Sequence, residues 1–219
     1  MQAYRTMTEI AVRALREKIL KGNFKPGTRL IPLKLERELA LGRVAIREAI
    51  RELSGSGLVE SIPNKGTIVA APPTLDEIKE IYKIRSIIEG KAAIQGTQGV
   101  SKEDLSRMET LHQKMTDESL PSPDYFLPNQ EFHFILYRSS GWQYLNKLIT
   151  QLWDHVLAFR SFHHLTQGDT TTFNLEHKQI LEAIKSGDSK EVGRLVQKNL
   201  QSGLNQILDQ MKMKLTELR

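Results

Sequence analysis

Apolar residues recur with a helical period through residues 43–53, RVAIREAIREL. At about 100° per residue, the apolar side chains fall on one stripe of a helix: Ile46, Ala49, Ile50 and Leu53. The neighbouring stripe carries three arginines, Arg43, Arg47 and Arg51. The pattern therefore predicts a helix that packs by one stripe and presents a row of guanidinium groups on the next.

The residues before this segment predict two more helices. A capping-box sequence begins at Thr6, and the apolar face that follows it ends at Gly22. Pro32 suits the first position of a short helix over residues 33–39, and residues 40–42 make a tight turn before the arginine-bearing helix. The short helix, the turn and the arginine-bearing helix together predict a helix-turn-helix.

The residues after this segment predict a small hairpin. Two short strands, residues 58–63 and 67–70, flank a glycine-containing turn at 64–66 that carries a lysine. An extended piece at 28–31 is expected to pair beside them. A helix-turn-helix followed by such a hairpin is a winged helix-turn-helix, a fold that commonly reads the major groove of DNA.

From residue 75 onward the sequence predicts helices and no strand. Six apolar stripes of helical period follow one another, at 78–92, 105–115, about 124–138, 142 to about 164, about 173–186, and a long last helix capped by Asp188. Short connections between them imply an antiparallel bundle. The predicted fold class is mostly α, with an N-terminal winged helix-turn-helix domain and a C-terminal antiparallel all-helical bundle.

The charge distribution supports the same division. Residues 1–70 contain 13 lysines and arginines against 7 glutamates and no aspartate, whereas the remainder has 18 basic against 19 acidic residues. A confined basic region beside a near-neutral body is typical of a nucleic-acid-binding module joined to another domain. The only Pro-Pro pair marks the boundary, which gives a DNA-binding domain at 1–71, a linker at 72–75 and a helical domain at 76–219.

Composition narrows the partner and the compartment. Only Tyr4 and Phe24 are aromatic in the first 70 residues, too few for the stacking platforms that bind RNA or single strands, so duplex DNA is the expected partner. No apolar run approaches the roughly 20 residues that span a bilayer, and the N-terminus is charged, so we expect a cytoplasmic protein with no membrane partner. The lack of cysteine excludes disulfides and thiolate metal sites.

Spaced motifs resemble the GntR family of bacterial transcriptional regulators over nearly all of residues 10–70. They occur in the family's order: the PGTRL turn, the RVAIREA helix, the GLV segment and the NKG wing. The second half is similar to the helical FCD effector domain of the FadR and VanR-like branch, on the segments IYKIRSIIEG, FHFILYRSSG and EHKQILEAIKSGD. The resemblance implies a winged DNA-binding domain and a helical domain that binds an effector.

The resemblance also implies which residues of the recognition helix contact DNA. Arg43 and Arg47 match positions that contact operator bases or phosphates, and an arginine can donate two hydrogen bonds to guanine. Val44 is expected to contact a thymine methyl group. For Arg51 two interpretations stay open: a DNA contact, or a surface role as a solvated arginine or in a pair with Glu48 or Glu52.

Two further positions depart from the family or lie on the wing. Leu33 stands where some members have another DNA-contacting arginine, and Lys34 is the neighbouring cation that could serve instead. Gly66 would let the wing approach the minor groove, with Lys65 on a phosphate.

Many members of this branch hold a divalent metal with an Asp-x-x-x-His pair and two further histidines. His133 and His177 match two of these positions, and Asn129 and Asn199 stand at the other two. Amides in place of a carboxylate and an imidazole weaken the hold on zinc or nickel. These four residues therefore leave three interpretations open: a weakened metal site, a metal-free polar pocket for an effector, or two ordinarily hydrogen-bonded histidines.

Arg85 is a candidate to hold the carboxylate of an effector, and the alternative is an intrahelical ion pair with Glu89. The leading hypothesis is a ligand-responsive regulator, most often a repressor, that binds a short inverted-repeat operator as a homodimer and responds to a small organic or sugar acid. The alternative is a DNA-binding protein whose bundle serves assembly alone. A metal-assisted hydrolase is disfavoured, because no carboxylate base lies at metalloprotease spacing, and we expect no enzymatic activity.

Overall fold

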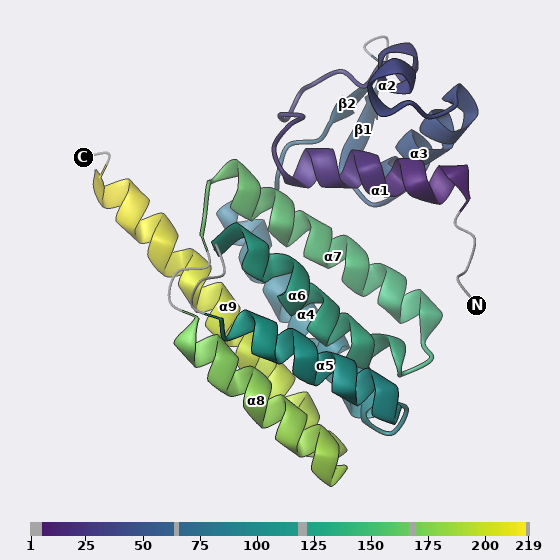
Figure 1. Cartoon of the computed structure of the whole chain (residues 1–219). Coiled ribbons are helices and arrows are strands. Elements are labelled where there is room, and N and C mark those ends of the chain that lie inside the picture. Colours follow the sequence, from purple (N-terminus) through teal and green to yellow (C-terminus); the bar gives the residue numbers. More distant parts are fainter. Residues whose placement is uncertain (1–5, 64–65, 118–121, 167–169, 218–219) are drawn as a thin grey trace. The chain divides into compact units, whose positions relative to one another are not determined.

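The computed structural model describes residues 6–63, 66–117, 122–166 and 170–217 (Figure 1). The chain forms two compact units, one of residues 1–78 with 151–164 and one of residues 79–150 with 165–219. The first unit contains the segment in which the helix-turn-helix was predicted, and the second contains most of the predicted bundle. The domain boundaries at 71 and 76 stay a prediction.

The N-terminal elements form the predicted winged helix-turn-helix. They are α1 (Met7–Leu20), α2 (Pro32–Leu39), α3 (Arg43–Gly55), β1 (Val59–Ile62) and β2 (Gly66–Val69). Helix α3 packs against α1, α2 and β1, and its apolar stripe is buried in a core that all these elements share. Because Ile46 and Leu53 are fully buried, the opposite side of α3 is held facing outward.

Local sequence signals set the ends of these helices. Thr6 and Glu9 form the reciprocal capping box at the start of α1, as predicted. Pro32 occupies the first turn of α2, where its missing N–H group costs no hydrogen bond. Ala40 ends α2 in the left-handed conformation, with φ of 52°, which makes the sharp turn into α3. The turn therefore fixes the angle at which α3 is presented.

The wing is a two-stranded antiparallel sheet with a short third partner. Val59 pairs with Val69 at one end of the hairpin and Ile62 with Gly66 at the other. Residue Arg29 bridges to Ile68 on the free side of β2, so the predicted pairing of the extended piece at 28–31 is confirmed. This segment ties the chain before α2 to the wing.

In the second part of the chain, every secondary-structure element among the described residues is a helix, as predicted. Its elements are α4 (Leu75–Thr97), α5 (Lys102–Met115), α6 (Ser122–Arg138), α7 (Gln143–Phe162), α8 (Thr171–Ser186) and α9 (Ser189–Glu217). Helix α5 packs on α6 and α8, and α8 packs on α9. None of the described helices is long and apolar enough to cross a membrane.

Two glycines allow α4 to approach the end of α6 closely. A Cβ atom on Gly96 would lie 2.0 Å from the carbonyl oxygen of Leu136, and one on Gly99 would lie 2.1 Å from that of Ser139. Any side chain at these positions would push the two helices apart. The close approach brings the polar residues of α4 against those of α6.

Candidate DNA-contacting face and buried polar core

The outward side of α3 carries the predicted DNA-contacting residues. Arg43, Val44, Arg47 and Arg51 are exposed, while the apolar stripe on the other side of the helix is buried. Val44 is 78% exposed, although valine is normally covered in a folded domain. An exposed apolar side chain flanked by arginines on a rigid helix suits contacts to base edges in a major groove.

The three arginines of α3 differ in their partners. Arg43 Nε lies 2.9 Å from Glu36 Oε2 on α2, and Arg51 Nη2 lies 2.5 Å from Glu48 Oε2 on α3 itself. The ion-pair interpretation of Arg51 is therefore confirmed. Within the described part of the chain, no ion pair involves Arg47. Its guanidinium group is thus available to an external anion.

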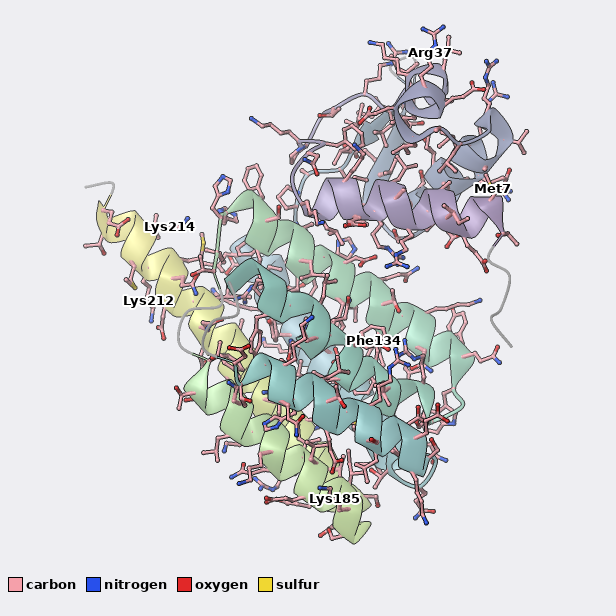
Figure 2. All side chains as sticks on the ribbon, viewed as in Figure 1. Met7, Arg37, Phe134, Lys185, Lys212 and Lys214 are labelled. Carbon is pink, nitrogen blue, oxygen red and sulfur yellow. The ribbon has the colours of Figure 1, made fainter. Side chains whose placement is uncertain are left out.

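The remaining predicted DNA contacts lie on α2 and on the wing. Lys34 is exposed on α2 beside Leu33, which is 47% exposed. Figure 2 shows Arg37 projecting from the same helix, a cation that the motif comparison did not single out. Gly66 opens β2 with a φ of 79°, a conformation that favours glycine. Lys65 lies outside the described residues.

The helical unit contains a second group of polar residues, which is buried. Arg85 and Glu89 on α4 form an ion pair with Arg85 Nε 2.5 Å from Glu89 Oε1, and their side chains are 3% and 0% exposed. The hydroxyl of Tyr137 on α6 donates to Glu89 Oε2 at 2.8 Å. The intrahelical interpretation of Arg85 is therefore confirmed, and its charge is neutralised inside the protein.

Two histidines extend this polar group from α6 to α8. Tyr137 Oη lies 3.4 Å from Nδ1 of His133, and His133 Nε2 lies 3.2 Å from His177 Nε2. The side chain of Asn199 on α9 hydrogen-bonds to His133. Three of the four residues that the sequence grouped, His133, His177 and Asn199, therefore come together.

The environment controls the protonation of these groups. Burial lowers the pKa of His133 to about 3, and the positive charge of Arg85 acts in the same direction. Burial also lowers the pKa of His177 well below its usual value, and the neighbouring His133 lowers it further. Burial disfavours the charged form of Arg85. Attraction to the Glu89 carboxylate outweighs the effect of burial, so the pKa of Arg85 is raised. Both histidines are therefore neutral at pH 7, and Arg85 is charged.

Glu176 is a buried carboxylate that sequence reasoning missed. It is 1% exposed and accepts hydrogen bonds from Asn199 Nδ2 at 2.9 Å and Ser202 Oγ at 2.8 Å. The sequence signal that could have identified Glu176 is its position directly before His177, on the buried side of α8. The amide N–H group of Asn199 thus donates to Glu176, and its amide oxygen faces His133.

The residues at the metal positions of the family do not fit zinc or nickel. Two imidazoles come together, but the other two positions are amides, and Asn129 is only partly buried, one turn before His133. In the described ranges, no three His, Asp or Glu side chains gather into a group that could hold a metal. Tight sites for these ions use imidazole, thiolate and carboxylate ligands. These four positions therefore lack the ligands of a tight zinc or nickel site.

The winged fold, the outward arginine face and the separate helical unit define a DNA-binding transcriptional regulator. Comparison with protein families agrees over both halves of the chain. Residues 7–69 match the bacterial regulatory proteins of the gntR family, and residues 80–202 match the FCD domain. The chain belongs to the GntR family of regulators with an FCD domain, whose members are transcriptional regulators and not enzymes.

Individual relatives and solved structures agree with this assignment. The chain is 28% identical over 174 residues to an uncharacterized HTH-type transcriptional regulator, YdhC, of Bacillus subtilis, covering 78% of this chain and 77% of the relative. It is 25% identical over 182 residues to the HTH-type transcriptional regulator McbR of Escherichia coli, covering 80% and 81%. The solved structure of E. coli McbR/YncC has the same fold, with a TM-score of 0.81, 21% identity and coverage of 95% of this chain and 100% of that one.

Proposed function

We propose that this regulator is a repressor that binds a short inverted-repeat operator as a homodimer in the cytoplasm and releases it in response to a small molecule. The observation that carries the DNA-binding part is the exposed face of α3, where Val44 and Arg47 project from a helix anchored by a buried stripe. Arg43 and Val44 lie at the start of that helix, and we assign base reading to them.

Helix α4 supports the dimer. Ile84, Ile87 and Ile94 are 48%, 62% and 38% exposed, and they recur at three- and seven-residue intervals along one side of the helix. A two-fold axis would pair this stripe with its copy on a second chain, as in isologous interfaces. The dimer would then present two copies of α3 to the two halves of a palindromic site.

The buried polar core supports effector binding. Nδ1 of His177 is buried and has no hydrogen-bond partner among the residues that the structure describes. A buried polar atom without a partner costs roughly 1 to 3 kcal/mol, and a ligand that supplies the missing bond would recover part of that cost. We place the effector beside Arg85, Asn129, His133, His177 and Asn199, with a small organic or sugar acid as its chemical class.

One observation favours a second candidate function, in which the bundle serves assembly alone. The guanidinium group of Arg85 is already paired with Glu89, so the carboxylate of an acid effector would have to displace a buried internal one. A thermal-shift screen of organic and sugar acids separates the two candidates. Stabilisation by an acid supports the effector, whereas no shift with any acid supports assembly alone.

A direct test of DNA reading begins with selection of duplexes from a random pool by the full-length protein. The affinity of wild type and of Arg43→Ala for the selected duplex is then compared with their affinity for a scrambled one. Loss of one good base contact should cost about 1 to 3 kcal/mol on the selected sequence alone. Equal affinity of both proteins for the selected duplex would refute base reading by Arg43.

A further inference from the structure

A hollow of about 490 Å³ lies within the winged unit, between α3 and the wing. The polar residues that line it are three arginines and three hydroxyl residues: Arg29, Arg47, Arg51, Ser54, Ser61 and Thr67. Among the described residues of its wall, none is acidic. The polar part of its lining therefore offers hydrogen-bond donors and positive charge, and the rest of the described lining is apolar or glycine.

Arg29 is the residue of this group that the sequence motifs did not single out. Its backbone bridges to Ile68, which fixes it beside the free side of β2. Its guanidinium group lies against the start of β2, because a Cβ atom on Gly66 would lie 3.3 Å from Arg29 Nη2. The side chain is thus placed by both the strand pairing and the glycine of the wing.

The charges of this hollow are not balanced inside the protein. Within the described ranges, no ion pair involves Arg29 or Arg47, whereas Arg51 is paired with Glu48. Like charges gathered without a counter-ion repel one another, and an anion bound between them relieves the repulsion. A phosphate diester offers two acceptor oxygens and one negative charge, which suit guanidinium and hydroxyl donors.

We propose that this hollow holds a backbone phosphate of duplex DNA, clamped by Arg47 from α3 and by Arg29 from the strand beside the wing. This inference rests on the proposed DNA binding and assigns different roles to the arginines. Arg29 and Arg47 fix the position of the duplex through its backbone, while Arg43 and Val44 at the start of α3 read its bases. Arg29 therefore sets affinity for any sequence and carries no sequence preference.

The test uses a short scrambled duplex, because a phosphate contact does not depend on sequence. Binding of the full-length protein is measured by fluorescence anisotropy between about 50 and 200 mM salt. Arg29→Ala should weaken binding roughly tenfold and lower the slope of log affinity against log salt by about one per bound protomer. On selected and scrambled duplexes the loss should be equal.

Arg13→Ala is the matched control, since Arg13 is an exposed arginine of α1 that does not line the hollow. It makes the same change in net charge and should leave the salt slope unchanged. Arg29→Lys keeps the charge and should retain most of the slope. Thermal unfolding of each variant checks that Arg29→Ala is folded.

The outcomes separate the clamp from the DNA binding on which it rests. If wild type binds the duplex and Arg29→Ala binds it with the same affinity and slope, the clamp is refuted and DNA binding stands. The clamp is also refuted if Arg13→Ala has the same effect as Arg29→Ala, because the loss then reflects net charge. If wild type binds no duplex at low salt, the proposed function itself fails.

Discussion

Arg43 Nε lies 2.9 Å from Glu36 Oε2, so the first arginine of the recognition helix is paired with the helix before it. Both side chains are partly exposed, at 50% and 33%. An ion pair at such exposure contributes little to stability. Its more important effect is to hold a negative charge beside a cation that we assign to the bases.

Removing that negative charge should strengthen DNA binding. We expect Glu36→Gln to bind duplex DNA several-fold more tightly than wild type, because Arg43 is released and repulsion of the phosphates is reduced. The free energy of unfolding should change by less than about 1 kcal/mol. Glu38→Gln is the control, since Glu38 of the same helix pairs with Lys18 of α1. Unchanged or weaker DNA binding by Glu36→Gln would contradict the assignment of Arg43 to the DNA bases.

The buried pair of α4 should behave differently. Glu89→Gln leaves the charge of Arg85 in a fully buried site without its carboxylate, so we expect a loss of about 3 to 5 kcal/mol in urea denaturation. Arg85→Met combined with Glu89→Leu removes both charges and should recover most of the stability. The exposed pair Glu191–Arg194 provides the comparison, because solvent screens that pair and Glu191→Gln should have a much smaller effect than Glu89→Gln. A small effect of Glu89→Gln would show that the pair is not buried in solution.

Stability should fall on mild acidification because His133 is buried and neutral. Its pKa is about 3 in the folded protein and near 6.5 in the unfolded chain, so only the unfolded chain takes up a proton between these values. The stability that the neutral His133 contributes is intact above about pH 6.5 and is lost as the pH falls. At about pH 5 the loss in the free energy of unfolding should be roughly 2 kcal/mol.

Urea denaturation at several pH values measures this effect. His133→Gln should flatten the dependence by one proton relative to wild type. His164→Asn is the control, because His164 is exposed and its left-handed backbone tolerates asparagine. A wild-type stability that does not change between about pH 7 and pH 5 would rule out the neutral histidine pair.

The two imidazoles and two amides of the polar core predict that zinc or nickel does not stabilise the wild-type protein. Zinc or nickel chloride should leave its melting temperature unchanged. Replacing Asn129→Asp and Asn199→His together would supply a carboxylate and a third imidazole, and this variant should gain stability with either ion. At about a hundredfold excess of metal over Kd the gain would be about 2.7 kcal/mol. Native mass spectrometry measures the stoichiometry, and metal retained by wild type would contradict the prediction.

The isoleucine stripe of α4 predicts the effect of a charge on assembly. Ile87→Glu should convert the proposed dimer to a monomer in light scattering, because a carboxylate would be buried against its copy across the proposed two-fold axis. Leu127→Glu is the control, since Leu127 is 66% exposed on α6 and lies outside the stripe. A dimer that survives Ile87→Glu would move the interface to another surface.

The sequence by itself determined the elements and the family. Helical periodicity, the capping box at Thr6 and the proline before α2 are local signals, so they specify helices without knowledge of the rest of the fold. The stripes of α3 likewise determined which side of that helix is buried and which carries arginines. Family motifs added the winged domain and the FCD domain, because their spacing is read along the chain.

Only the tertiary structure decided which side chains of different elements meet. Residues 89, 133, 137 and 177 lie on three helices, and no periodicity shows that Tyr137 and His133 link the ion pair of α4 to His177 of α8. The same holds for the contact of Glu176 with Asn199 and for the contact of Arg29 with the wing, which depends on strand pairing with Ile68. Contacts across elements depend on packing angles and distances, and these arise from the whole core and not from any one segment.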